Sequence, residues 1–418
     1  MTGSPIWHPF TQHAIFPEMR KIIGGSGAWL QAADGAQIFD AISSWWVVTH
    51  GHCHPNIVGA IRDQAEKLDQ VIFAGYTHEP AERFSQLLLD RLPAGLTRVF
   101  FSDSGSTSVE VALKMALGLW RHAGDGRSGI VVMENGYHGD TVGTMSAGER
   151  GVFNQPYEPL MFGVHKLPFP HPGQEQATLD ALEGHCRTGR MAAFLVEPLV
   201  LGAGGMLMYA PTLLAEMAAI CAHHQVLLIA DEVMTGWGRT GTFLACEQAG
   251  VVPDILCLSK GITGGSLPLA VTVCKEPVYQ AHWSKDRAKT FFHSSSYTAN
   301  PIACAAAAAN LELWVETPVL DHVAAVARAQ SDGAARLSRA KGIANVRQAG
   351  TILAAEIERP GGGYMSDLGP ELMTFFTQRN LLIRPLGNTV YLLPPYCSTA
   401  DELVRCHDAM IEAADAFA

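Results

Sequence analysis

Short apolar runs alternate with amphipathic stretches through the middle of this chain. The runs predict buried strands and cover residues 98–101, 129–133, 192–197, 226–232, 256–260 and 269–274. Between them, residues 106–122 and 211–224 carry apolar side chains at helical spacing. Continuously apolar strands that alternate with helices favour a mostly parallel sheet covered by helices on both faces. We therefore predict an α/β fold whose ligands bind beyond the carboxyl ends of the strands.

The pattern changes after an Ala-rich helix predicted around residues 303–314. A long helical run over residues 318–341 leads into short strands mixed with helices, which is typical of a smaller α+β lobe. A chain of 418 residues also exceeds one ordinary hydrophobic core. We predict a large domain over residues 56–316 and a smaller one that joins residues 1–55 to residues 317–418.

Composition narrows the class of protein. The chain is 48% hydrophobic and 17% charged, as in a globular protein, and its formal charge of −11 argues against nucleic acid or an anionic membrane as a partner. No apolar stretch reaches the roughly 18 residues needed to span a membrane, and the N-terminus lacks a signal-peptide pattern. Nine scattered cysteines favour reduced thiols and a cytoplasmic location.

The stretch "AISSWWVVTHGHCHP", residues 41–55, combines two unusual features. Trp45 and Trp46 are adjacent, although a regular strand or helix usually buries only one of two neighbouring side chains. Four possible metal ligands then follow within five positions: His50, His52, Cys53 and His54. A closed metal site requires further ligands at suitable spacing, so we interpret the histidines as a turn before a helix that begins at Pro55, and we predict no metal.

Lys260 and Asp231 each stand at the carboxyl end of a predicted strand. A lysine beside apolar surface can have its pKa lowered and attack a carbonyl group, although an exposed strand-end lysine is an equal alternative. A carboxylate at Asp231 needs a cation or hydrogen-bond donors. Enzymes that use pyridoxal 5′-phosphate (PLP) pair a Schiff-base lysine with an aspartate on the pyridinium nitrogen, and this pair of residues fits that chemistry.

Two further turns follow predicted strands. In "SDSGSTS", Gly105 and Ser106 open a helix whose first N–H groups can bind phosphate, although Ser106 can equally be a helix cap. In "ENGYHGDT", Tyr137 offers an aromatic face for a pyridine ring and a phenol for a substrate, and His138 and Asp140 flank it.

Together these motifs resemble the class III, PLP-dependent aminotransferases of fold type I. The resemblance covers nearly the whole chain and is carried by "SDSGS", "YHGDT", "IADEVMTGWGRTG", "LSKG" and "HSSSYTANP". Within that class, "WHPFTQ", "SSWW", "LGAGGM" and "IRPLG" are similar to members that act in biotin biosynthesis. The resemblance implies transfer of an amino group from S-adenosylmethionine to 8-amino-7-oxononanoate, which gives 7,8-diaminononanoate.

The resemblance also implies a role for each matching residue. The implied catalytic residues are Lys260, which would form the Schiff base with PLP, Asp231, which would hold the pyridinium proton, and Tyr137, which would stack on the cofactor ring. The implied cofactor-binding residues are Gly105, Ser106, Tyr137, His138, Asp231, Lys260 and, from the other subunit of a homodimer with shared active sites, Ser295 and Ser296. The implied substrate-binding residues are Phe10, Trp45, Trp46, Tyr137, Asp140, Ser294, Tyr391 and Arg384, of which Arg384 would hold the carboxylate of the oxononanoate.

Phe10 and Ser294 depart from the family pattern. Many relatives carry tyrosine in place of Phe10, so a phenol hydrogen bond is lost here, and glycine in place of Ser294. The alternatives are an ω-amino acid:pyruvate aminotransferase of the same class, an aminomutase or racemase of the same fold, and a PLP-sensing regulator. The regulator would need a basic DNA-binding module, which this acidic chain lacks.

Overall fold

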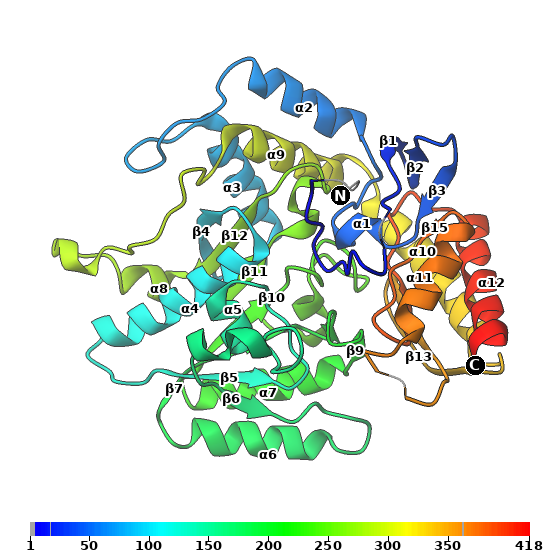
Figure 1. Cartoon of the computed structure of the whole chain (residues 1–418). Coiled ribbons are helices and arrows are strands. Elements are labelled where there is room, and N and C mark those ends of the chain that lie inside the picture. The colour runs from blue at the N-terminus through cyan, green and yellow to red at the C-terminus, as the bar shows by residue number, and fades with distance from the viewer. Residues whose placement is uncertain (1–4, 17, 362) are drawn as a thin grey trace.

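The computed structural model of the chain describes residues 5–16, 18–361 and 363–418. Residues 1–4, which belong to the N-terminal stretch considered above for a signal peptide, lie outside the described residues. Two lobes lie side by side in Figure 1, and the N-terminal strands join the C-terminal helices in the smaller lobe. No helix in the described ranges is long and apolar enough to cross a membrane.

The larger lobe is built on a seven-stranded sheet. Its strands, in spatial order, are β4 (Leu96–Ser102), β12 (Ala270–Lys275), β11 (Ile255–Leu258), β10 (Leu227–Asp231), β7 (Met191–Val196), β5 (Gly129–Met133) and β6 (His165–Leu167). The five strands from β11 to β6 run parallel, whereas β12 is antiparallel to both of its neighbours. Each of the six predicted runs falls on one of these strands, so the prediction of a mostly parallel sheet is confirmed.

Helices cover both faces of this sheet. One face packs against α4 (Gly105–His122), α5 (Val142–Ala147) and α8 (Glu276–Gln280). The other packs against α3 (Glu79–Arg91), α6 (Glu175–Cys186), α7 (Pro211–His223) and α9 (Pro301–Glu316), and α2 (Pro55–Ala65) lies on α9. Side chains of β5 alternate between the two layers, with Ile130 and Val132 on the α4 side and Val131 and Met133 on the opposite side.

The smaller lobe joins the two ends of the chain. One sheet contains β1 (Ile22–Ser26), β2 (Trp29–Ala32), β3 (Gln37–Asp40) and β15 (Leu381–Leu382), and the other contains β13 (Ile343–Ala349), β14 (Ile352–Ile357) and β16 (Thr389–Leu392). The helices that cover them are α10 (Val319–Leu337), α11 (Leu368–Gln378) and α12 (Ala400–Phe417). Because β3 pairs with β15, the N-terminal segment is part of a sheet with the C-terminal region.

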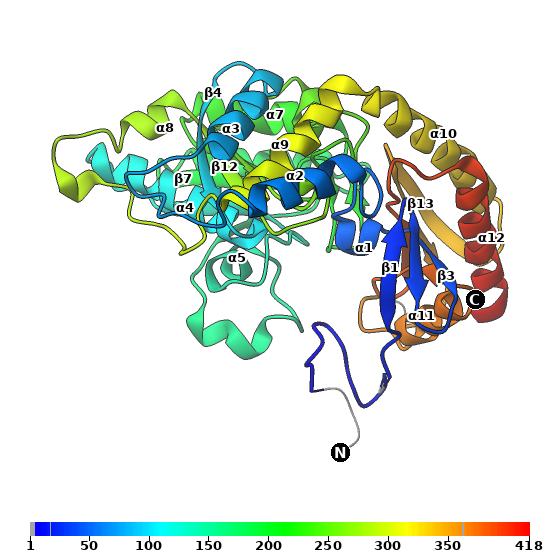
Figure 2. The same ribbon diagram turned by 90° about the horizontal axis from the view of Figure 1, so that it is seen from above.

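Short elements make up the remainder. They are α1 (Ser43–Trp46), the strand pair β8 (Val200–Leu201) and β9 (Leu207–Met208), and the 3-10 turns η1 (Gln155–Leu160), η2 (Ala245–Ala249), η3 (Lys260–Thr263) and η4 (Arg287–Lys289). Figure 2 shows α1 at the junction of the two lobes. We propose that the two lobes correspond to the predicted division into residues 1–55, 56–316 and 317–418.

Two predicted elements differ in detail from the structure. The strand expected over residues 256–260 ends at Leu258, because the backbone of Ser259 (φ −160°, ψ −142°) turns into η3. The helix expected over residues 318–341 ends at Leu337, before Gly342, whose φ of +76° does not continue a helix. In contrast, α2 begins at Pro55 as predicted, and His54 is its N-cap residue.

Candidate active site

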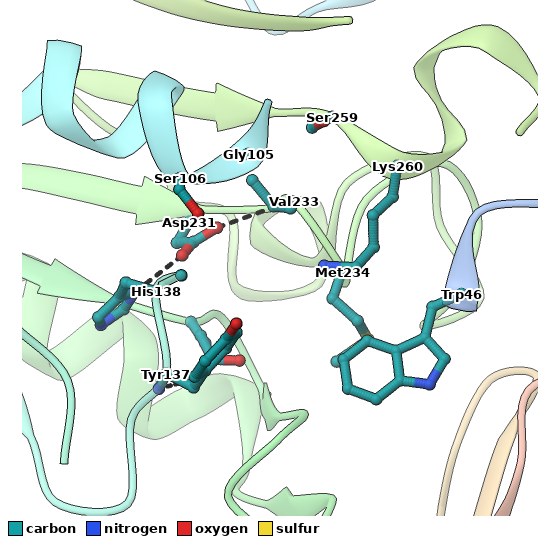
Figure 3. A pocket seen from close by; sticks show the side chains of 12 residues that line it. Trp46, Gly105, Ser106, Tyr137, His138, Asp231, Val233, Met234, Ser259 and Lys260 are labelled. Atoms are coloured by element: carbon teal, nitrogen blue, oxygen red, sulfur yellow. Dashed lines mark hydrogen bonds and ion pairs between the residues drawn. The ribbon is translucent and has the colours of Figure 1, made fainter. Parts of the chain in front are cut away.

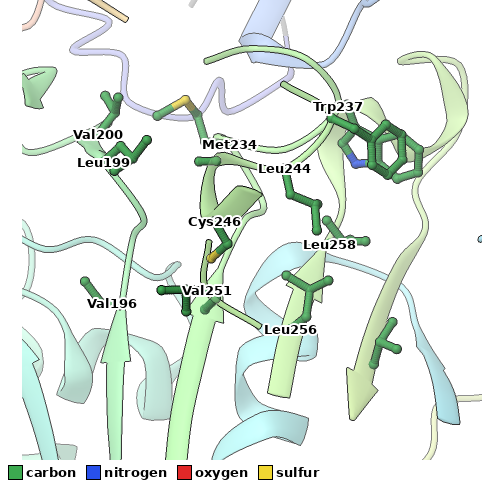
Figure 4. Packing of buried hydrophobic residues seen from close by; sticks show 14 of the residues in the cluster. Val196, Leu199, Val200, Met234, Trp237, Leu244, Cys246, Val251, Leu256 and Leu258 are labelled. Carbon is green, nitrogen blue, oxygen red and sulfur yellow. The ribbon is translucent and has the colours of Figure 1, made fainter. Parts of the chain in front are cut away.

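A cavity lies beyond the carboxyl ends of the parallel strands and encloses about 530 Å³, open solvent at its mouth included. It is lined by Trp46, Gly105, Ser106, Tyr137, His138, Gly139, Glu197, Asp231, Val233, Met234, Ser259 and Lys260. These residues come from segments that are far apart in sequence (Figure 3). In Figure 4, Met234 and Trp237 lie past the arrowheads of the parallel strands; both belong to the apolar core, and Met234 also lines the cavity.

Lys260 begins η3, directly after the sheet. Its side chain extends into the cavity toward Trp46, and its Nζ lies 5.2 Å from the Trp46 ring centroid. Burial lowers the pKa of Lys260, although the negative charges of Asp231 and Glu197 oppose this shift. A lowered pKa increases the share of uncharged amine, and within the described residues Nζ has no hydrogen-bond partner. The amine is therefore available as a nucleophile or base.

Asp231 ends β10 and is held by two donors. Its Oδ1 accepts a hydrogen bond from the Val233 amide at 3.1 Å, and its Oδ2 lies 2.7 Å from His138 Nδ1. Both side chains are buried, at 5% exposure for Asp231 and 1% for His138. The carboxylate is thus fixed at the cavity wall, where it can stabilise a cation bound inside.

The turn before α4 provides an anion site. Ser104 is the N-cap and forms a capping box with Thr107, so the cap role considered for Ser106 belongs to Ser104. This leaves Ser106 at the cavity, where its hydroxyl accepts a hydrogen bond from the Asp140 amide at 3.3 Å. A Cβ on Gly105 would lie 2.7 Å from Val233, so glycine is required for the close approach. The first amides of α4 can bind a phosphate group here.

Glu197 is a cavity residue that the sequence reasoning missed. It follows β7 at the carboxyl end, and this position is the signal that could have found it. Its carboxylate accepts hydrogen bonds from the amides of Tyr137 at 2.9 Å and Gly202 at 3.0 Å. Burial raises the pKa of Glu197 to about 7, and the charge of Asp231 adds to this effect while His138 opposes it. By binding the Tyr137 amide, Glu197 fixes the loop that presents this tyrosine. The pKa of the Tyr137 phenol is raised, mainly by burial and further by the charge of Asp140.

Trp45 and Trp46 have different environments because α1 is not a regular helix. Ser44 and Trp45 have non-helical backbone angles inside it, and the carboxylate of Asp40 binds the Ser44 amide and hydroxyl at 2.8 and 3.0 Å. Trp46 is 5% exposed and lines the cavity, and its Nε1 donates to the Tyr391 hydroxyl at 2.9 Å. Tyr391 therefore lies behind Trp46. Trp45 is 44% exposed and is not among the cavity-lining residues.

Trp45 instead belongs to a second group, which we call the aromatic rim: Phe10, Trp45, Phe153, Tyr364 and Arg384. Its rings are linked through Phe10, which lies 5.7 Å from Trp45 and 6.3 Å from Phe153 between ring centroids. Arg384 donates to the Phe10 carbonyl at 2.7 Å and lies 5.5 Å from the Trp45 ring centroid. The structure therefore brings together Phe10, Trp45 and Arg384, which were predicted from distant parts of the sequence.

The serines predicted to serve a neighbouring subunit lie on an exposed loop. Ser295 donates its hydroxyl to the Asp103 carboxylate, and the Ser296 carbonyl accepts from Gln70 Nε2 at 2.7 Å. Ser294, Ser295 and Ser296 do not line the cavity of their own chain. The same is true of Asp140, which is exposed beside Ser106.

The histidine-rich stretch forms the predicted turn. His52 Nε2 lies 2.8 Å from Asp40 Oδ2, and Cys53 is exposed with a φ of +54°. Over the described ranges, no group of three or more His, Cys, Asp or Glu side chains is arranged to hold a metal ion.

Comparisons with known proteins agree with this geometry. The sequence model of the family described as "Aminotransferase class-III" matches residues 16–414. The chain is 47% identical to the adenosylmethionine-8-amino-7-oxononanoate aminotransferase of Synechococcus elongatus, over 98% of both chains. It is 35% identical to the enzyme of that name from Geobacter sulfurreducens, over 95% of this chain and 93% of the relative.

Solved structures are similar along the whole chain. The adenosylmethionine-8-amino-7-oxononanoate aminotransferase of Methanocaldococcus jannaschii matches with a TM-score of 0.94 and 31% identity, over 99% of this chain and 97% of the other. A PLP-bound amine transaminase from an uncultivated Pseudomonas species matches with a TM-score of 0.90 and 30% identity, over 99% and 98% of the two chains.

Proposed function

The chain belongs to the class III aminotransferase family, and from this premise we propose that it uses PLP to transfer the amino group of S-adenosylmethionine to 8-amino-7-oxononanoate. The product is 7,8-diaminononanoate, for biotin biosynthesis. The proposed reaction type rests on one observation: Lys260 and Asp231 line the same cavity, at the carboxyl ends of the parallel strands. The full-length similarity to relatives of that name supports the substrates.

The residues present fit PLP. The Lys260 amine has no hydrogen-bond partner in the described part of the chain, and its lowered pKa suits attack on an aldehyde. The carboxylate of Asp231 matches a protonated ring nitrogen, and the first amides of α4 match a phosphate. The Trp46 and Tyr137 rings supply apolar walls for a flat cofactor.

The chemistry divides between the cofactor and the chain. PLP, when bound, supplies the carbonyl group and the ring that withdraws electrons from the substrate carbon. Lys260 would hold the cofactor, and its amine would move a proton from the substrate carbon as a general base. Asp231, fixed by His138 and Val233, would hold the proton on the ring nitrogen. Glu197 holds Tyr137 in place through the backbone.

We assign substrate recognition to the aromatic rim together with Trp46, Asp140 and Ser294, and Tyr391 contributes from behind by accepting the hydrogen bond of Trp46. Aromatic faces can pack against both an adenine ring and a methylene chain, so one pocket can serve both substrates. Arg384 would hold the carboxylate of the oxononanoate, because a guanidinium matches a carboxylate with two parallel hydrogen bonds. Phe10 can stack without the hydrogen bond that a tyrosine would add.

We further propose that the enzyme is a homodimer in which Ser295 and Ser296 complete the phosphate site of the partner subunit. Their exposed loop and their absence from the cavity of their own chain support this assignment. We also propose a cytoplasmic location, which the nine free cysteines support.

A panel of amino donors tests the proposal. Purified protein loaded with PLP would be mixed with S-adenosylmethionine, lysine or β-alanine, and the cofactor absorbance followed through one half-reaction. 8-Amino-7-oxononanoate or pyruvate would then be added as acceptor and the product identified by mass. We expect S-adenosylmethionine with 8-amino-7-oxononanoate to give the fastest turnover. Turnover by β-alanine with pyruvate alone would show instead the ω-amino acid:pyruvate reaction.

Arg384→Met should weaken the acceptor and spare the donor. A hydrogen-bonded charged pair is worth about 1.5–3 kcal/mol, so the KM for 8-amino-7-oxononanoate should rise about 10- to 100-fold. The single-turnover rate with S-adenosylmethionine should change far less. Arg384→Lys, which keeps the charge without the bidentate geometry, should be intermediate. An unchanged acceptor KM in Arg384→Met would remove this residue from the substrate site.

A further inference from the structure

The turn that carries Lys260 has a strained backbone. Lys260 has a φ of +43°, in the left-handed region that a non-glycine residue rarely adopts, and Gly264 and Gly265 follow with φ of +63° and +90°. Such a conformation costs about 1–3 kcal/mol and persists only where surrounding contacts determine it. The structure must therefore hold this turn from outside.

Asn310 supplies that contact. It lies in α9, has 0% exposure, and donates from Nδ2 to the carbonyl oxygens of both Gly261 and Ile262, each at 3.1 Å. These are the two residues directly after Lys260. One amide group thus fixes the path of the backbone that presents the reactive amine.

The oxygen of the Asn310 amide is not satisfied in the same way. Oδ1 is buried and has no hydrogen-bond partner in the described part of the chain. A Cβ placed on Gly264 would lie 3.4 Å from this oxygen, so Oδ1 also faces the turn. An unpaired buried polar atom costs about 1–3 kcal/mol, so Asn310 lowers stability at this point, and a role in fixing the turn accounts for its presence.

We propose that Asn310 is a positioning residue for Lys260, because its amide fixes the backbone of Gly261 and Ile262, directly after the reactive amine. The inference rests on the proposed function, because the positioned amine is the one that moves the substrate proton. An amine displaced by about 1 Å loses on the order of 100-fold in rate, which sets the scale of the expected effect.

Two variants of Asn310 test the proposal. Asn310→Leu keeps the side-chain size and removes the amide, whereas Asn310→Gln keeps an N–H donor. We expect kcat to fall about 10- to 100-fold in Asn310→Leu, with KM changed less than about 3-fold, and Asn310→Gln to lose less activity than Asn310→Leu.

A measurement on the protein without cofactor separates this proposal from the proposed function. Hydrogen exchange of the amides in residues 261–265 should be faster in Asn310→Leu than in wild type, whichever substrates the enzyme uses. If Asn310→Leu does not fold, Asn310→Asp, which keeps the size of the side chain and removes its N–H group, takes its place. Unchanged exchange or unchanged kcat would overturn the proposal.

Discussion

Lys260→Ala is expected to lower turnover by about 10⁴-fold or more, because the same amine serves as nucleophile and as general base. Lys260 is the only lysine among the described residues that line the cavity, so no other amine can replace it there. The variant should also lose covalent attachment of the cofactor. Borohydride reduction followed by mass analysis of the peptide around residue 260 measures this directly, and steady-state rates measure turnover.

Lys341→Ala is the matched control, because Lys341 is exposed between α10 and β13 of the smaller lobe and does not line the cavity. It should retain wild-type turnover and cofactor attachment. A cofactor that remains covalently trapped in Lys260→Ala would show that another residue forms the bond, and the assignment of the reactive lysine would then be withdrawn.

Asp231→Asn should give the second large loss. The asparagine has the same shape but no charge, so a protonated ring nitrogen would lose its counter-ion in a buried site. Removing one partner of a buried ion pair costs about 3–5 kcal/mol, which corresponds to about 10²- to 10⁴-fold in kcat. Single-turnover rates with the amino donor measure the effect on the proton-transfer step.

A permanently charged cofactor distinguishes the electrostatic role from a structural one. PLP methylated on the ring nitrogen keeps its positive charge without a counter-ion, so it should restore part of the rate of Asp231→Asn. It should not help Lys260→Ala. Full activity of Asp231→Asn with ordinary PLP would contradict the role given to this carboxylate.

The aromatic rim illustrates why the sequence reasoning reached the substrate site only in part. Phe10, Trp45 and Arg384 were each named from a local motif, but nothing local shows that Arg384 binds the Phe10 carbonyl across 374 positions. The same motif placed Trp45 beside Trp46, whereas the Asp40 carboxylate directs the backbone between them so that only Trp46 lines the cavity.

Glu197 and Asn310 were missed for related reasons. Glu197 directly follows an apolar strand, and this position alone could have pointed to it, but its hydrogen bonds from two backbone amides are visible only in the folded chain. Asn310 follows a run of alanines in a helix, and the sequence alone does not distinguish this buried amide from an ordinary polar helix position. Its role becomes visible only once α9 packs against η3.

By itself the sequence determined the order of strands and helices, the family, and the placement of Lys260 and Asp231 at the carboxyl ends of two predicted strands. These follow from apolar periodicity and local motifs, which act over a few residues. Tertiary structure alone decided which tryptophan faces the cavity, that the strands before Lys260 and Asp231 are neighbours, and which polar group holds the turn of Lys260. Those outcomes depend on contacts between distant segments, such as the hydrogen bond of Trp46 with Tyr391, 345 positions apart, and no local pattern encodes them.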